Sequence, residues 1–224
     1  MTGACKLSTT QILSAILVII IIGTLTAYAY TNANDALKDS VKQGMKSTAG
    51  AMATQINASD IAKFQPGDDA SPAYIAETRQ LRNMRSMDDH ILNAYILKVN
   101  PDRTITFLVD DLAEYDPQGS AKIGEVSTAP DKLEIFSALS GPTTSKEPYT
   151  TKYGSFISAY APIDDSSVGS SGNTYAILAI DMSADDYNRY TSKGALILLT
   201  GIVSMIIAVG AIFWFGRRIE KKSE

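Results

Sequence analysis

The apolar positions of this chain gather in two long runs near its ends. Residues 12–29 carry no charged side chain over 18 positions, and residues 194–215 carry none over 22 positions. A helix rises about 1.5 Å per residue, so about 22 residues reach roughly 33 Å, enough for a bilayer core of about 30 Å. The pattern therefore predicts one transmembrane helix over residues 12–30 and a second over residues 194–215.

The residues that flank these runs predict an orientation in the plasma membrane. Trp214 and Phe215 close the second run, and residues 216–224 then carry four basic side chains. Interfacial aromatic residues followed by Lys and Arg are typical of the cytoplasmic side. We therefore expect both tails, residues 1–11 and 216–224, to be cytoplasmic and residues 31–193 to lie outside the cytoplasm.

The first run also fits a different interpretation. Its last residues, Ala27-Tyr28-Ala29, match the small-residue cleavage site of a secretory signal peptide. However, the run is longer than the apolar core of about 7–15 residues that such a peptide has. We favour an uncleaved transmembrane helix, and both interpretations place residues 31–193 outside.

The segment after the first run has the period of a helix. Apolar residues over 32–56 recur mostly every fourth position, which predicts a long helix that continues from the first span. Ser71 before Pro72 is a good N-cap, and it predicts a second amphipathic helix over residues 74–87.

Beyond residue 93 the period changes from helical to two. Residues 94–99 and 104–110 predict a hairpin, and residues 153–162 and 174–182 predict two further strands. Short helices are expected over 131–139 and 185–193, and a flexible hairpin tip over 164–173. Hairpins that follow a pair of helices indicate the α+β class.

The alternation of side chains along the strands assigns them to two faces. In the strand over residues 104–110, it places Val109 with Phe107 on one face and Asp110 on the other. In the last strand, the even-numbered residues form an apolar face suited to a packed helix, and Asp181 lies on the opposite face. A face of this mixed kind is expected where a sheet covers a semi-polar cavity.

Charge and composition exclude several classes of function. Residues 31–193 carry 15 basic and 22 acidic side chains, a net charge of −7 that disfavours nucleic-acid binding. Cys5 lies before the first span, so the outer domain has neither a disulfide nor a thiol, and His90 is the single histidine of the chain. With no G-x-S-x-G motif and no P-loop, the sequence predicts no enzyme, no cofactor and no metal centre.

Three stretches of the outer segment resemble one family. They are the helix and hairpin over residues 74–110, Lys122–Glu125 with Ala138–Gly141 after it, and the hairpin over residues 158–181. In this order and spacing they are similar to the Cache-type, PAS-like sensor domains of prokaryotic two-span membrane receptors. The resemblance covers most of residues 31–190.

This resemblance implies a five-stranded antiparallel PAS-like sheet with a long N-terminal helix on one face and a small-molecule pocket on the other. The implied ligand is an amino acid, an amine or a carboxylate. Tyrosines can instead be core residues, Asp181 can cap a helix, and arginines can form a solvated face. The ligand-binding candidates are Tyr95, Asp110, Tyr149, Tyr153, Tyr160 and Asp181, with Arg79, Arg82 and Arg85 for a carboxylate.

The sequence thus indicates a membrane-anchored sensor that binds a small molecule and relays its state through the two spans. Only nine residues follow Phe215, so we expect the signal to pass to a separate partner, unless the chain does not signal or is a fragment. The helical stripe over residues 33–56 makes a homodimer plausible. The alternative is a structural or accessory subunit of a cell-envelope complex.

Overall fold

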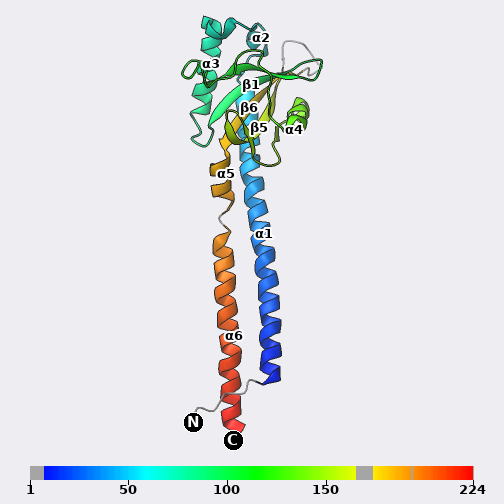
Figure 1. The fold of residues 1–224 in the computed structure, drawn as a ribbon, viewed down its shortest axis with the longest axis vertical. Helices are drawn as coiled ribbons and strands as arrows, with labels where there is room; N and C mark the ends of the chain where they lie inside the picture. The colour runs from blue at the N-terminus through cyan, green and yellow to red at the C-terminus, as the bar shows by residue number, and fades with distance from the viewer. Residues whose placement is uncertain (1–7, 165–173, 193, 224) are drawn as a thin grey trace. The chain divides into compact units, whose positions relative to one another are not determined.

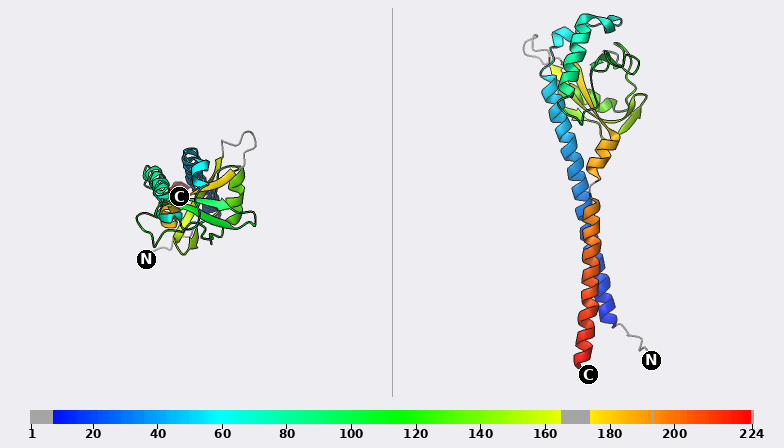
Figure 2. Two further views of the ribbon diagram at one scale, coloured as in Figure 1. Left: turned by 90° about the horizontal axis from the view of Figure 1, so that it is seen from above. Right: turned by 90° about the vertical axis from the view of Figure 1, so that its left-hand side faces the viewer.

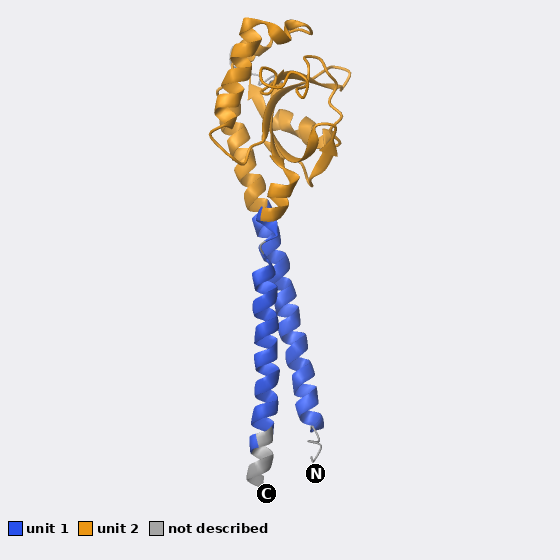
Figure 3. Ribbon diagram, turned by 60° about the vertical axis from the view of Figure 1, so that its left-hand side comes forward, with its two compact units in different colours: residues 1–38, 190–224 blue, residues 39–189 orange. Residues whose placement is uncertain are grey.

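The computed structural model describes residues 8–164, 174–192 and 194–223. Most of the expected hairpin tip over 164–173 therefore lies outside the described residues. The chain divides into two compact units, residues 1–38 with 190–224 and residues 39–189 (Figures 1 and 3).

The first unit holds two apolar helical segments. They are the N-terminal part of α1 (Thr9–Ala53) and the helix α6 (Ala195–Ser223). Both helices are long and apolar enough to cross a membrane. Within this unit, Gly201 lies against Thr26 so closely that a Cβ atom there would meet the threonine side chain at 2.3 Å. Two membrane-length helices can approach closely where one of them presents glycine.

The second unit is built around one antiparallel sheet with the strand order β2-β1-β6-β5-β3. A sixth strand, β4, also pairs with β5, so two short strands share the edge where one was expected. This confirms the α+β class and the antiparallel sheet. The strands are β1 (Asn93–Val99), β2 (Ile105–Asp110), β3 (Thr143–Thr144), β4 (Tyr149–Thr151), β5 (Gly154–Asp164) and β6 (Thr174–Ser183).

The helices of this unit begin and end close to their expected positions. Ser71 caps α3 (Pro72–Arg85), because its side-chain oxygen accepts a hydrogen bond from the Tyr74 N–H at 3.2 Å. Two short elements, α2 (Ala58–Ile61) and η1 (Asp68–Ala70), were not expected, because one helical turn has no readable period. The remaining helices are α4 (Lys132–Ser137), η2 (Ala138–Ser140) and α5 (Ala184–Thr191).

The sheet separates two apolar clusters. Figures 1 and 2 show α3 and α4 on opposite sides of the strands. On one face, residues of α1 and α3 pack with the even-numbered residues of β6, as the alternation predicted. On the other face, a smaller cluster joins β1, β2 and β6 to the α4 segment. The larger cluster includes Met45, Ala49, Met52, Tyr74, Leu81, Met84, Ala176, Leu178 and Ile180.

A bulge in β2 overturns part of the predicted facing. Ile96 pairs with Val109 and Leu97 pairs with Phe107, so Leu108 is an extra residue in this strand. Leu108 and Val109 both belong to the helix-covered cluster. The prediction that Val109 shares the face of Phe107, with Asp110 opposite, is therefore wrong. One inserted residue inverts the alternation beyond it and places Asp110 on the same face as Phe107.

Candidate functional site

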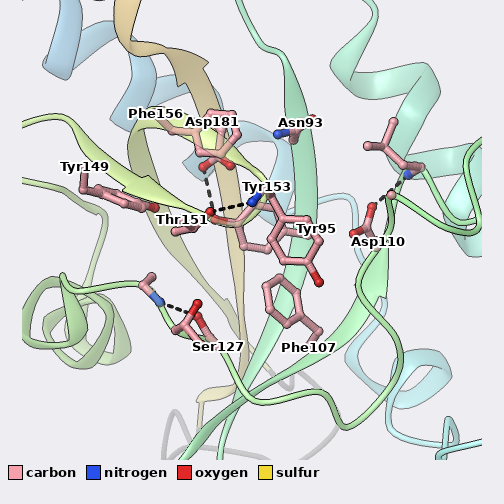
Figure 4. Close-up of a pocket in the computed structure, with 14 residues that line it drawn as sticks. Asn93, Tyr95, Phe107, Asp110, Ser127, Tyr149, Thr151, Tyr153, Phe156 and Asp181 are labelled. Carbon is pink, nitrogen blue, oxygen red and sulfur yellow. Dashed lines mark hydrogen bonds between the residues drawn. The ribbon is translucent and has the colours of Figure 1, made fainter.

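A pocket opens on the face of the sheet that α1 and α3 leave uncovered. Residues of β1, β2, β4, β5 and β6 line it, together with the loops over 112–119 and 127–129. The cavity has a volume of about 80 Å³, and the space up to and including its mouth is about 610 Å³. Its walls are largely aromatic, with two carboxylates among them (Figure 4): Tyr95, Phe107, Tyr149, Tyr153 and Phe156 with Asp110 and Asp181.

Asp181 lies near the end of β6 and is only 3 % exposed. Its Oδ1 atom accepts hydrogen bonds from the hydroxyls of Ser158 at 2.5 Å and Tyr95 at 3.1 Å. Burial raises the pKa of this carboxyl to about 7, and hydrogen bonds from Ser158, Tyr95 and Asn93 act in the opposite direction. Among the described residues, no Lys or Arg forms an ion pair with Asp181.

A chain of hydroxyls leads from Asp181 to a second buried carboxylate. The Tyr149 hydroxyl lies 2.7 Å from Ser158 Oγ and 3.1 Å from the Tyr160 hydroxyl. Tyr160 in turn donates to Asp131 Oδ2 at 2.6 Å. Tyr160 is fully buried and does not line the pocket, so its predicted role as a direct ligand contact stays a prediction.

Asp110 lies on the other side of Tyr95 from Asp181 in Figure 4. Its two oxygens accept backbone N–H groups, from Leu112 at 2.9 Å and from Ala121 at 2.8 Å. Burial raises its pKa to about 6, against the effect of these two bonds. Asp110 thus fixes the loop that forms one wall, and the bulge of β2 is what brings it there.

Tyr153 holds the aromatic wall at the rim. Its hydroxyl donates to Glu125, which also accepts Lys152 at 2.8 Å. The rings of Tyr153 and Phe107 are 6.1 Å apart, and those of Phe107 and Tyr95 are 5.3 Å apart. The first pair is an edge-to-face contact and the second is tilted, and an edge-to-face contact stabilises aromatic neighbours beyond their burial. The rings therefore form one continuous apolar surface.

The three arginines of α3 do not line this pocket. Arg79 and Arg82 both reach Glu114 at 3.0 Å, and Arg85 pairs with Asp111. Arg79 and then Arg82 hold the pKa of Glu114 down to about 2. The arginines join α3 to the segment that follows β2, and their predicted role as ligands of a carboxylate stays a prediction.

The structure also assigns residues that sequence reasoning missed. Ser158 lies on the same face of β5 as Tyr160, so alternation could have found it. Asp131 precedes α4 and resembles an ordinary helix cap in the sequence, and only the tertiary structure brings it to Tyr160. Phe107 was expected on the face that packs against a helix, and Phe156 was not named; both line the pocket.

No protein-family model and no curated protein sequence matches this chain. Several solved structures are similar. The sensory domain of the Campylobacter jejuni chemoreceptor Tlp3 with isoleucine bound is 17 % identical, covers 79 % of this chain and 67 % of its own, and has a TM-score of 0.40. The same ligand-binding domain with L-norvaline is 16 % identical, with coverages of 76 % and 64 % and a TM-score of 0.38.

The periplasmic domain of RsbU from Chlamydia trachomatis is 12 % identical, with coverages of 52 % and 38 % and a TM-score of 0.35. These neighbours are described as sensory, ligand-binding or periplasmic domains. Because their TM-scores lie below 0.5, we argue the ligand and the role from the residues of this chain.

Proposed function

We propose that the chain is a membrane-anchored sensor whose pocket binds a small organic ammonium compound, an amine or an amino acid. The observation that carries this proposal is Asp181. It is a buried carboxylate at the wall of a cavity, and it has hydroxyl donors but no ion-pair partner among the described residues. A buried carboxylate without a cation is costly, and an ammonium group would supply the missing charge.

The walls of the pocket favour an ammonium that carries an apolar group. Aromatic faces attract cations and pack well against aliphatic carbon, and the rings of Tyr95, Phe107, Tyr149, Tyr153 and Phe156 line the cavity. The cavity of about 80 Å³ is well above the roughly 10–15 Å³ needed to hold one water. It therefore admits a small ligand, and a longer one can extend into the space at the mouth.

A plain carboxylate ligand fits this pocket less well. Two acidic side chains, Asp110 and Asp181, line the cavity. The arginines that could hold a carboxylate are engaged with Glu114 and Asp111. A ligand with only negative charge would meet repulsion and find no bidentate partner.

The chain itself offers a route from the pocket to the second span. Asp181 lies on β6 (Thr174–Ser183), and α5 (Ala184–Thr191) follows without a loop. A ligand that binds one arrangement of this connection more tightly than another would shift the balance between them. We propose that a second copy or a separate membrane partner reads this shift, with the C-terminal tail on the cytoplasmic side.

Calorimetric titration of the full chain in lipid nanodiscs tests the proposal. The panel includes isoleucine, norvaline and n-propylamine, and n-propanol is the neutral control for the last of these. We expect at least one ammonium compound to bind wild type, n-propanol not to bind, and Asp181→Asn to weaken binding by about a hundredfold. A folded chain that binds no member of the panel would overturn the sensor proposal and favour the accessory-subunit alternative.

A further inference from the structure

The hydroxyl chain between the two buried carboxylates has one proton too few. Five contacts connect Tyr95 to Asp181, Asp181 to Ser158, Ser158 to Tyr149, Tyr149 to Tyr160, and Tyr160 to Asp131. Each hydroxyl carries one proton, so three tyrosines and one serine supply four. If both carboxyls are ionised, Ser158 and Tyr160 donate outward to them, and the single proton of Tyr149 must serve two contacts.

One additional proton on either carboxyl satisfies all five contacts. If Asp181 is protonated, it donates to Ser158, and each hydroxyl donates onward until Tyr160 donates to Asp131. If Asp131 is protonated, the same four bonds run in the opposite direction and end on Asp181. Tyr95 donates to Asp181 in both arrangements. The network thus has two complete states that differ only in where the proton lies.

The side chain of Asp131 belongs to this network and does not cap α4. It occupies the N-cap position of α4, yet its side chain makes no capping bond there. Its Oδ2 accepts the hydrogen bond of Tyr160, and its Oδ1 is buried without a partner among the described atoms. An unpartnered buried carboxylate oxygen is costly when it is charged, which favours a state with a proton on this group.

The groups around the two carboxyls leave no nearby cation to replace the proton. Tyr95 of β1, Tyr149 of β4, and Ser158 and Tyr160 of β5 face Asp181. Glu134 on α4 raises the pKa of Asp131 further, and Asp131 raises the pKa of Asp181. In the part of the chain that the structure describes, neither Asp131 nor Asp181 forms an ion pair.

We propose that Asp181 and Asp131 share a single proton through Ser158, Tyr149 and Tyr160, and that an ammonium at Asp181 drives this proton to Asp131. In that step four protons each cross one contact, and Asp181 becomes ionised as Asp131 becomes protonated. The site takes up the cation without releasing a proton to solvent. The second half of this proposal rests on the proposed function; the sharing of the proton does not.

Infrared titration of the full chain without ligand tests the sharing. The carbonyl stretch of a protonated carboxylic acid is followed with pH and assigned through Asp→Asn variants. In wild type we expect the network to hold one acid proton at pH 6. In Asp131→Asn, the amide can donate to Tyr160, so Asp181 should ionise with a midpoint lower by about one pH unit or more.

Two further variants make the infrared result decisive. Tyr149→Phe interrupts the chain and leaves three contacts for three protons, so the acid band at pH 6 should shrink while the fold is kept. Glu114→Gln removes a carboxyl that pairs with Arg79 and Arg82 away from the pocket, and it should leave the midpoint of Asp181 unchanged. An unchanged Asp181 midpoint in both Asp131→Asn and Tyr149→Phe would show an isolated buried acid and overturn the proposal.

Calorimetry with n-propylamine at pH 6 tests the ligand-driven step separately. We expect the same binding enthalpy in two buffers with different heats of ionisation, because the proton stays in the site. A buffer-dependent enthalpy that corresponds to release of one proton would overturn this step. If n-propylamine does not bind, the ammonium-driven half is wrong for this probe, and the infrared result still decides the sharing.

Discussion

The two faces of the sheet have different roles, although their side chains come from the same strands. The face under α1 and α3 is a packed apolar cluster in which Leu178 and Ile180 are fully buried. On the opposite face, Ala179 belongs to a smaller apolar cluster and Asp181 lines the pocket. Adjacent residues of β6 therefore have different roles: Leu178 and Ile180 stabilise the packed face, and Asp181 lines the pocket.

This comparison also explains why the pocket can hold costly polar groups. A buried carboxylate with a raised pKa destabilises the folded state at neutral pH. Close packing of apolar side chains supplies stability that does not depend on pH. The helix-covered face therefore carries the stability of the unit, and the pocket face can keep Asp181 and Asp131 in place for binding.

The largest expected effect comes from the helix-covered face. Leu178→Ala removes buried methyl groups and should lower the free energy of unfolding by about 3 kcal/mol. Amine binding by the remaining folded protein should be unchanged. Urea unfolding of the full chain and calorimetry measure the two quantities. A variant that keeps its stability but loses binding would reverse the roles of the two faces.

The matching change on the pocket face should do the opposite. Asp181→Asn keeps the shape of the side chain but removes its charge, so amine affinity should fall by about a hundredfold. Stability at pH 7 should not fall, because the variant no longer buries an unpaired carboxylate. If Asp181→Asn unfolds the unit and leaves the affinity of the folded fraction intact, Asp181 is structural.

The two faces should also differ in their response to pH. The pKa of Asp181 rises from its ordinary value near 4 to about 7 on folding. The folded state therefore binds this proton more tightly, and the stabilisation is complete below about pH 4 and is lost as pH rises toward 7. The effect is at most about 1.4 kcal/mol per pH unit in this window.

Subtraction isolates the proton that Asp181 shares with Asp131 from the protons of acids outside the hydroxyl chain. We expect the difference in unfolding free energy between wild type and Asp181→Asn to change between pH 4 and pH 7 and to be constant above it. Asp110, with a pKa near 6, is present in both proteins and cancels. The difference in unfolding free energy between wild type and Leu178→Ala should not change with pH. A flat difference for Asp181→Asn would contradict the raised pKa.

The smallest expected effect concerns the arginines of α3. Arg79 is exposed and pairs with Glu114 away from the pocket. Exposed ion pairs contribute little to stability, so Arg79→Ala should leave unfolding and amine affinity within experimental error. A marked loss of affinity would mean that α3 contributes to the ligand site after all.

Much of the fold could be predicted because its signals are local. Ser71 and Pro72 mark the start of α3, and the two-residue period marks β1, β5 and β6. The bulge at Leu108 could not be predicted, because an extra residue shows itself only in the pairing with β1. For that reason Phe107 was expected on the face opposite Asp110, whereas both residues line the same pocket.

The candidate site was predictable in its parts and not in its connections. Tyr95, Tyr149, Tyr153 and Asp181 line one pocket as the family resemblance implied. Asp131 was missed, because its link to Tyr160 crosses 29 positions of the chain. The spacing of three residues between the arginines predicts that they share one face of α3. Which residues that face contacts depends on how α3 packs, and this could not be predicted from the sequence.

An experimentally solved structure of the full chain soaked with n-propylamine tests the central claim most directly. The nitrogen atom should lie within about 3 Å of the Asp181 carboxylate. The carbon chain should lie against the rings of Tyr95 and Phe107. A ligand with its apolar end toward Asp181, or density for it only outside this pocket, would contradict the assignment of Asp181 as the cation anchor.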